Sequence, residues 1–487
     1  MKNNFQSLLY FIPEITIVVT ILLAIVSDLV NDLKKYTHYL TLFGLSLTGL
    51  FLLLDSSTSV SKFLFNDMLL FDSVSYYFKC IILFSTFSVI LVSKYSKELD
   101  DEYRPEFNTL LLVVLLGMFL MTNSINLIMI YLALELVSIP SYVLAGILKN
   151  DKKSNEASLK YVIFGSFASG LMLYGFSLLY GLSGTLNIYE IHSILSSVNN
   201  PTAVLFSILL ILAGFGYKIS MVPFHYWTPD VYEGSPTTVT AFLSVAPKAA
   251  GFALMLRVFL NLFTIGGNFT STLPILDINW PLLLAILSAI TMTVGNVLAL
   301  RQENVKRMLA YSTISHVGFM LMALCTLTPV ALTGISFYLL MYAFMNLSSF
   351  YMVIYMSNNY KAETIDDWKG IAFKSPVLSF FMVLNMVSLA GLPPTSGFIG
   401  KVYLFRGLFF DQEFYWLGII AVLNSVVSLY YYFKIVKSMY FFEDSNKKYK
   451  KPHPVINWSI IVLSSQNLLF YFYWSGLYEY IEGIFNL

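Results

Sequence analysis

Long apolar runs follow one another along almost the whole chain, with short polar stretches between them. A transmembrane helix needs about 20 consecutive, mostly apolar residues. The first run is too long for the apolar part of a signal peptide, and no small-residue cleavage site follows it, so we interpret it as a span. The pattern predicts fourteen spans, at residues 8–30, 37–55, 69–93, 106–123, 125–147, 157–182, 202–222, 238–262, 278–300, 305–326, 329–357, 375–406, 413–438 and 455–480.

Basic residues alternate from one connection to the next. The even-numbered connections carry only Lys62 and Arg406. The odd-numbered connections carry 20 basic residues: Lys34, Lys35, Lys94, Lys97, Arg104, Lys149, Lys152, Lys153, Arg301, Lys306, Arg307, Lys361, Lys369, Lys374, Lys434, Lys437, Lys447, Lys448, Lys450 and Lys451. Loops rich in Lys and Arg stay on the cytoplasmic side. The alternation therefore supports fourteen spans and predicts that both termini lie outside.

Two of the predicted spans contain helix breakers in mid-membrane. Residues 212–226 read LAGFGYKISMVPFHY, and residues 388–401 read SLAGLPPTSGFIGK. Proline removes a backbone donor and clashes with the preceding turn. Broken helices at corresponding places in two halves indicate a transporter built from repeats. We therefore expect an all-α membrane protein with two inverted five-helix repeats, each with one broken helix, and the segments 1–104, 105–262 (first repeat), 263–438 (second repeat) and 439–487.

Composition agrees with a membrane protein and narrows its chemistry. The chain is 57% hydrophobic and 12% charged, with a net charge of +1, which gives no basic field for nucleic acid. Its two cysteines are isolated and its five histidines are scattered, so we expect no iron–sulfur cluster, zinc site or haem. No Gly-rich nucleotide loop follows a strand-like run. We expect no cofactor and no metal in this chain.

Several charged residues fall inside predicted spans. The acid nearest the middle of a span is Glu135, and the basic residues are Lys79, Lys160, Lys218, Lys248, Arg257 and Lys401. Each charge at the bilayer centre costs about 2.5–3.5 kcal/mol on insertion scales. Such residues line a hydrated interior path or pair with one another. A row of this kind is suited to moving protons.

A buried lysine can carry a proton because desolvation penalises the ammonium and favours release of the proton. A nearby carboxylate has the opposite effect. A glutamate–lysine pair whose separation changes is therefore a switch on the proton affinity of the lysine. Glu135 with Lys218 is a candidate for such a pair.

Other interpretations stay open for some of these residues. Lys79 and Arg257 can snorkel to an interface, and Lys160 can be a cation at a loop end. A lone histidine in a span, such as His316, is more often a satisfied core residue.

Several acidic residues are expected away from the membrane centre. Asp230 and Glu233 fall in a connection, where a solvated position is the simpler interpretation. The remaining ones lie near span ends: Glu14, Asp28, Asp72 and Asp277.

Five motifs resemble the antiporter-like membrane subunits of respiratory complex I, over about residues 105–440. They are ALELVSIPSY (133–142), SNEASLKYVIFGS (154–166), KISMVPFHYWTPDVYEGSPTTVTAFLSVAPKAA (218–250), KRMLAYSTISHVGF (306–319) and SLAGLPPTSGFIGK (388–401). Within that family the chain is most similar to the N-type subunits, called chain 2 in mitochondria. Lys401 stands where the M-type subunit typically has glutamate, and the chain stops soon after span fourteen, without the lateral helix of the L-type subunit.

The resemblance implies a role for each matching residue. Glu135 and Lys218 match the glutamate–lysine pair, Lys248 the central lysine, Lys401 the terminal lysine, and His316 the histidine between them. A further match is Lys160, a lysine near the pair. The family moves protons along such a row when a neighbouring subunit reduces quinone.

The resemblance also implies partners and a location. Flavin, iron–sulfur clusters, NADH and quinone would be bound by partner subunits. Expected neighbours are the M-type and K-type subunits, the lateral helix of the L-type subunit, and lipid. The expected location is the bacterial inner membrane. A sodium/proton antiporter subunit of the multi-subunit type, a membrane subunit of a hydrogenase-type complex and an inert membrane anchor remain the alternatives.

Overall fold

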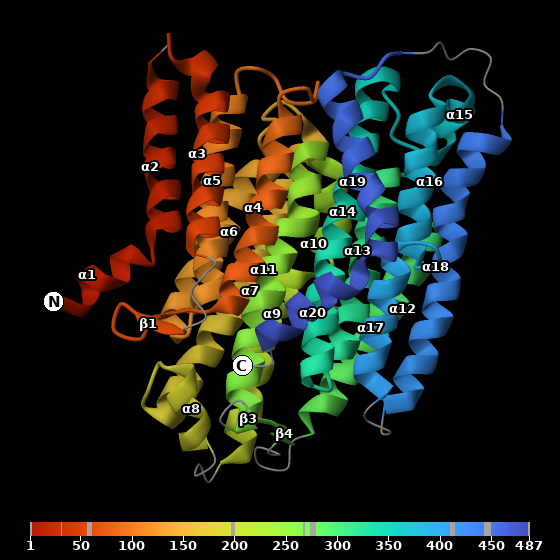
Figure 1. Ribbon diagram of the computed structural model, residues 1–487. Helices are drawn as coiled ribbons and strands as arrows, with labels where there is room; N and C mark the ends of the chain where they lie inside the picture. The colour runs from red at the N-terminus through yellow and green to blue at the C-terminus, as the bar shows by residue number, and fades with distance from the viewer. Residues whose placement is uncertain are drawn as a thin grey trace. The chain divides into compact units, whose positions relative to one another are not determined.

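The computed structural model of the chain describes residues 2–30, 32–55, 61–195, 200–265, 268–272, 279–409, 414–442 and 450–485 (Figure 1). Asp277, Lys447 and Lys448, which enter the predictions above, lie outside the described residues. Contacts divide the chain into two compact units. The first consists of Met1–Ile90, Leu99–Ile219 and Ala246–Asn279, and the second of Leu91–Glu98, Ser220–Val245 and Trp280–Leu487.

Helices make up most of the first unit, with two small antiparallel hairpins. Its elements are α1 (Lys2–Leu9), α2 (Ile12–Leu29), η1 (Lys34–Tyr36), α3 (Thr37–Asp55), β1 (Lys62–Leu64), β2 (Leu69–Phe71), most of α4 (Ser73–Ser93), α5 (Arg104–Asn123), α6 (Leu127–Ala145), α7 (Lys152–Ser183), α8 (Ile188–Leu195), α9 (Pro201–Ile219), the second part of α11 (Thr237–Phe263), β3 (Thr264–Ile265) and β4 (Asn268–Thr272). Helix α7 packs on α9, α5 on α6, and α2 on α3 and α5.

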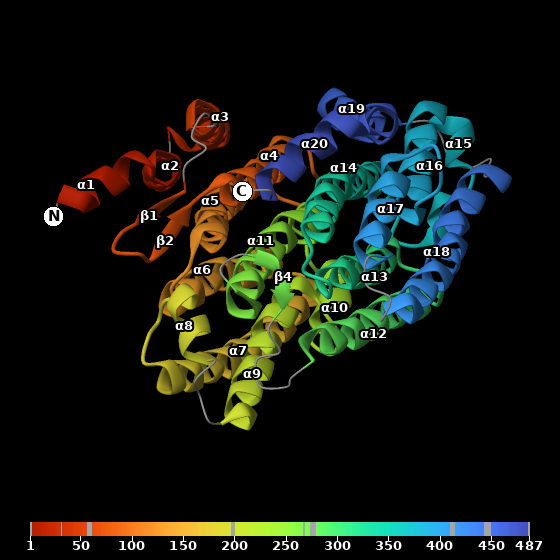
Figure 2. The same cartoon turned by 60° about the horizontal axis from the view of Figure 1, so that its bottom comes forward.

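Described residues of the second unit are helical apart from their connections. Its elements are α10 (Trp227–Gly234), the first part of α11, α12 (Trp280–Leu300), α13 (Val305–Leu324), α14 (Pro329–Tyr360), η3 (Ile365–Trp368), α15 (Ile371–Lys374), α16 (Pro376–Ala390), α17 (Ser396–Phe409), α18 (Tyr415–Phe441), α19 (Pro454–Phe472) and α20 (Trp474–Phe485). Helix α12 packs on α13 and α18, and α14 packs on α16, α17 and α19, as Figure 2 lets the reader follow.

Twelve helices among the described residues are long and apolar enough to cross a membrane. The other two predicted spans correspond to α13, which is rich in polar residues, and to the pair α16–α17, whose members are 15 and 14 residues long. The chain is therefore a multi-pass helical membrane protein. The first predicted span, residues 8–30, is divided between the end of α1 and α2. Helix α2 starts anew because Pro13 lies in its first turn, where proline favours the start of a helix.

Both predicted helix breaks are confirmed. Helix α9 ends at Ile219 and is followed by Ser220 with φ +68°, and α10 begins only at Trp227. Helix α16 ends at Ala390 and is followed by Gly391 with φ +81°, before α17 begins at Ser396. Each break ends a helix close to a candidate lysine.

Buried ion pairs correct part of the sequence interpretation. Lys79 on α4 is fully buried and lies 2.5 Å from Glu14 on α2. Arg257 on α11 lies 2.7 Å from Asp72, with its side chain 3% exposed. Neither cation snorkels to an interface, because a carboxylate within its own unit neutralises it in place.

Asp230 and Glu233 lie in the expected connection and are partly exposed, but they are not on a free loop. Both lie on α10 and contact Arg307 of α13, at 2.5 and 3.0 Å. A short helix after the break in α9 was not expected, and it turns two apparent loop acids into partners of one arginine.

In the second unit, several of the odd-numbered connections between predicted spans are hydrogen-bonded to one another. The Glu98 carboxylate, between α4 and α5, accepts hydrogen bonds from Thr237 and Ser357. The Val305 N–H, at the start of α13, donates to the Glu363 carbonyl at 3.0 Å. These contacts between odd-numbered connections agree with the prediction that such connections lie on one side of the membrane. Which side that is stays a prediction.

Candidate functional site

In the first unit Lys218 is held by the helix that carries Glu135. It lies in the last turn of α9 and is 3% exposed. Its Nζ donates to the Ser138 Oγ at 3.1 Å. Ser138 and Glu135 are three residues apart on α6 and so share a helix face. The ammonium also lies at the C-terminal end of α9, where the helix dipole favours a positive charge.

The Glu135 carboxylate is close to Lys218 without being bonded to it. The two charges interact electrostatically, while the Lys218 ammonium is bonded to Ser138. The Oε1 atom of Glu135 is buried and has no hydrogen-bond partner among the described residues. A buried carboxylate oxygen without a donor has a strong drive to gain one. The pair is therefore open in this structure.

Lys248 lies on α11 directly after Pro247 and is 1% exposed. A Cβ atom added to Gly251, one turn further on, would lie 2.8 Å from Ile219 and 3.7 Å from the Lys218 side chain. The missing side chain thus lets α11 approach the end of α9. This approach brings Lys248 close enough for its charge to interact with that of Lys218.

In the second unit Lys401 is bound by the end of the broken helix. It lies on α17 and is 4% exposed. Its Nζ donates to the Ala390 carbonyl at 2.8 Å and to the Ser425 Oγ at 3.3 Å. The same ammonium lies 4.7 Å from the centre of the Phe319 ring. Lys401 thus satisfies one of the carbonyls that the end of α16 leaves without a helical partner.

His316 lies on α13 between two phenol hydroxyls. The Tyr432 Oη is 2.9 Å from its Nε2, and the Tyr338 Oη is 2.7 Å from its Nδ1. The imidazole is 2% exposed, and its charge would interact with that of Lys401. The structure therefore brings His316 and Lys401 together within the second unit.

Lys160 has a different environment from the other candidates. It lies on α7 with its side chain 36% exposed, and its Nζ is 2.7 Å from the Glu156 Oε1 one turn earlier. This position is that of a cation on a helix face. Its role in proton transfer stays a prediction.

Sequence reasoning missed the groups that hold these residues. Ser138, Ser425, Tyr338 and Tyr432 supply hydroxyls to the candidate lysines and the histidine. Only Ser138 had a signal, its place one turn from Glu135. The chain has 33 tyrosines, and nothing in the sequence distinguishes Tyr338 and Tyr432 from the others.

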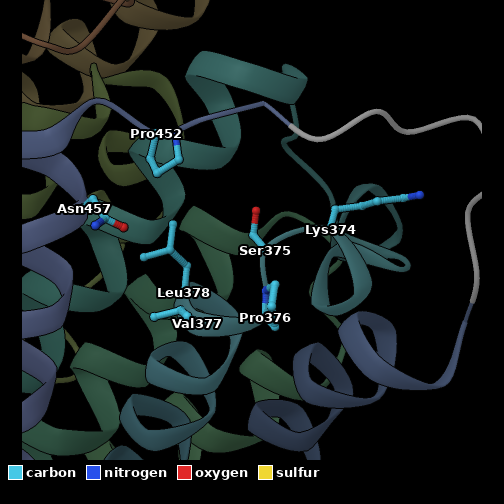
Figure 3. Close-up of a pocket in the computed structure, with 7 residues that line it drawn as sticks. All are labelled: Lys374, Ser375, Pro376, Val377, Leu378, Pro452 and Asn457. Carbon is cyan, nitrogen blue, oxygen red and sulfur yellow. The ribbon is translucent and has the colours of Figure 1, made fainter.

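Within each unit the candidates include amines, an imidazole or hydroxyls, which are groups that can accept and release protons. Among the described residues there is no group of three His, Cys, Asp or Glu that could hold a metal ion. A cavity of about 350 Å³ in the second unit contains none of the candidates (Figure 3); it is lined by Lys374, Ser375, Pro376, Val377, Leu378, Pro452 and Asn457.

Comparisons with known proteins give a consistent result. Residues 124–428 match the family described as NADH:quinone oxidoreductase/Mrp antiporter, transmembrane. NADH-quinone oxidoreductase subunit N 2 of Chloroherpeton thalassium is 43% identical, over 90% of this chain and 86% of that protein. NADH-quinone oxidoreductase subunit N 2 of Sorangium cellulosum is 40% identical, over 98% of this chain and 97% of that protein.

Solved structures resemble the chain along nearly its whole length. A chain of respiratory complex I from Thermus thermophilus with bound aureothin has a TM-score of 0.77 at 29% identity, covering 94% of this chain and 96% of that one. A chain of the Mrp complex from Dietzia sp. has a TM-score of 0.81 at 20% identity, covering 100% of this chain and 97% of that one. At the lower identity the likeness shows the fold alone.

Proposed function

The chain belongs to the NADH:quinone oxidoreductase/Mrp antiporter family of transmembrane proteins, and we propose that it is the N-type, proton-translocating membrane subunit of an NADH:quinone oxidoreductase. Identity of about 40% to proteins named subunit N, over most of both chains, supports this choice within the family. The observation that carries the mechanism is the set of buried amines, Lys218, Lys248 and Lys401.

The proposed mechanism uses Glu135 and Lys218 as the switch. When the Glu135 carboxylate closes on Lys218, it stabilises the ammonium and holds its proton. When the pair opens, desolvation favours the neutral amine and the proton is released. Lys248, His316 and Lys401 are the further carriers of the row, and Lys160 is an additional group near the pair. Quinone reduction in another subunit would supply the free energy.

The wider assignments follow from the same proposal. The chain would have fourteen spans, α13 and the pair α16–α17 supplying the two beyond the twelve long helices, and two inverted repeats at 105–262 and 263–438. Both termini would lie on the periplasmic side of a bacterial inner membrane. Its neighbours would be the M-type and K-type subunits and the lateral helix of the L-type subunit. NADH, flavin, iron–sulfur clusters and quinone would be bound by partners.

A sodium/proton antiporter subunit is the second candidate, because the family description covers both kinds of protein. The fold does not separate the two. The relatives that are about 40% identical over most of this chain carry the name of the oxidoreductase subunit, which favours the first candidate.

Lysine-to-methionine variants test the proposed row, because methionine keeps much of the length and removes the charge. Lys218→Met, Lys248→Met and Lys401→Met should assemble but lose most coupled proton translocation, measured as protons moved per NADH oxidised by the reconstituted complex. Lys152→Met, at an exposed position at the start of α7, is the matched control. Full proton translocation by the Lys248→Met enzyme would contradict the proposed relay through this lysine.

A further inference from the structure

His316 is held by hydroxyl groups from two other helices. Tyr338 lies on α14 and Tyr432 on α18, and both phenol rings are buried. The two hydroxyl oxygens are hydrogen-bonded to the two ring nitrogens of the same imidazole, at 2.7 Å for Tyr338 and 2.9 Å for Tyr432. Beyond it, the Tyr432 hydroxyl is hydrogen-bonded to the Ser312 hydroxyl, one turn earlier on α13. Four polar groups from three helices thus form one unbroken chain.

The hydrogen bonds that link Tyr338, His316, Tyr432 and Ser312 can all point in either direction along this hydrogen-bonded chain. A neutral imidazole donates from one nitrogen and accepts at the other, whereas a phenol hydroxyl does both. In one arrangement Tyr338 donates to Nδ1, and Nε2–H donates to Tyr432, which donates to Ser312. In the reverse arrangement Ser312 donates to Tyr432, which donates to Nε2, and Nδ1–H donates to Tyr338. In both cases every hydrogen bond of the chain has one donor and one acceptor.

We propose that Tyr338 and Tyr432 are relay residues, which pass protons to and from His316 by reversing the direction of this hydrogen-bonded chain. The inference rests on the proposed function and adds two residues that the row did not include. The backbone beside Lys401 approaches one end of the chain, because a Cβ at Gly400 would lie 2.6 Å from the Tyr338 ring.

The transfer balances as a relay of one proton. A lysine ammonium or a water molecule gives a proton to the Tyr338 oxygen, while the former hydroxyl proton of Tyr338 moves to Nδ1. The Nε2 proton moves to the Tyr432 oxygen, the former Tyr432 proton moves to Ser312, and the Ser312 proton leaves to water or a neutral amine. One proton enters and one leaves, and each group keeps its charge. The reset needs the Nε2–H tautomer of His316 again: Nδ1 releases its proton to water, Nε2 takes up a proton from water, and the three hydroxyls rotate back to the first direction.

Tyr342 offers a matched comparison. Its ring centre is 5.3 Å from that of His316, compared with 5.9 Å for Tyr338, so it packs on the imidazole much as Tyr338 does. Its hydroxyl donates to Thr313 at 2.9 Å, and the two imidazole nitrogens are instead bonded to Tyr338 and Tyr432. Removing this hydroxyl disturbs the same cluster without interrupting the chain.

The test uses Tyr338→Phe, Tyr432→Phe and the control Tyr342→Phe in the complete membrane-bound complex. Each change removes one hydroxyl and keeps the ring. The readouts are the amount of assembled complex, the rate of coupled NADH oxidation and the protons translocated per NADH in vesicles. Positioned proton transfer is worth about 10²–10⁴-fold in rate. We expect Tyr338→Phe and Tyr432→Phe to lower coupled turnover by about tenfold or more, with Tyr342→Phe close to the unchanged protein.

Two further variants keep the inference separate from the proposed function. If Lys401→Met stops translocation while both Tyr338→Phe and Tyr432→Phe translocate normally, the tyrosine relay is wrong and the lysine row stands. If Lys401→Met translocates normally, the row itself is wrong. Ser312→Ala tests the same chain at its end and decides the case if a phenylalanine variant fails to assemble; an unchanged translocation ratio there overturns the inference as well.

Discussion

Single residues set the position of each candidate cation through hydroxyl and carbonyl oxygens. Lys218 is bonded to Ser138, and Lys401 to Ala390 and Ser425. A neutral acceptor satisfies an ammonium without the strong attraction of a carboxylate, so the proton can still leave. Lys79 and Arg257 show the contrast, since each lies against a carboxylate.

Gly391 is a position where one methyl group should disturb a candidate lysine. Its φ of +81° disfavours any side chain, and an added Cβ would lie 2.6 Å from the Lys401 Cδ. We expect Gly391→Ala to lower thermal stability and to reduce proton translocation by displacing Lys401. Gly181→Ala on α7 is the control, because a Cβ there meets nothing within 4 Å. Equal translocation by the two variants would contradict this account.

Helix α11 begins at a carboxylate from a distant part of the chain. The Glu98 oxygens accept from the Thr237 N–H at 2.6 Å, from the Thr237 hydroxyl at 2.9 Å and from the Ser357 hydroxyl at 2.6 Å. Burial alone would raise the pKa of Glu98, but the charge of Lys306 and these hydrogen bonds outweigh it and lower the pKa below its ordinary value. Glu98 is therefore an ionised cap for the helix that carries Lys248.

Glu98→Gln should lower stability with a defined dependence on pH. Because the folded-state pKa is lowered, the stabilisation is present above the unfolded value of about 4.3 and is lost as pH falls through the folded one. We expect the variant to melt at a lower temperature from neutral pH down to about pH 5, with a loss of about 1–3 kcal/mol for a charged hydrogen bond, and the difference to shrink at more acidic pH.

The matched control for this cap is Glu102→Gln, which changes an exposed carboxylate in the same connection. This variant should melt like the unchanged protein at every pH. A difference in melting temperature between the Glu98→Gln and Glu102→Gln variants that grows as pH falls would have the wrong sign and would refute the cap.

On the scale of the whole molecule, the chain holds amines and an imidazole, and the proposed function takes its driving force from partner subunits. Its odd connections are lysine-rich, and Lys218, Lys248, His316 and Lys401 are buried. Under the proposed function, other chains would oxidise NADH and reduce quinone.

Mass spectrometry of the chains that copurify in mild detergent tests this assignment. We expect subunits that bind flavin and iron–sulfur clusters, together with several multi-pass membrane subunits. Copurification with small membrane proteins alone, in the absence of any redox subunit, would instead support the antiporter candidate. In that case the same buried lysines would work with an ion gradient as the driving force.

The sequence by itself determined the membrane class and both helix breaks, and it supplied the candidate row as a prediction. Long apolar runs have only one stable environment, and proline or glycine in mid-span interrupts a helix whatever surrounds it. The motifs around Glu135, Lys218 and Lys248 were also sufficient to indicate the family. These features are local in the sequence, so no tertiary contact was needed to find them.

The tertiary structure alone decided which groups hold the candidates. Ser138 lies 80 residues before Lys218, Tyr432 lies 116 residues after His316, and Glu98 lies 139 residues before Thr237. Glu14 and Asp72 became partners of buried cations in the same way. Hydrogen bonds and ion pairs depend on ångström distances between side chains that packing brings together, and no period or local motif encodes them.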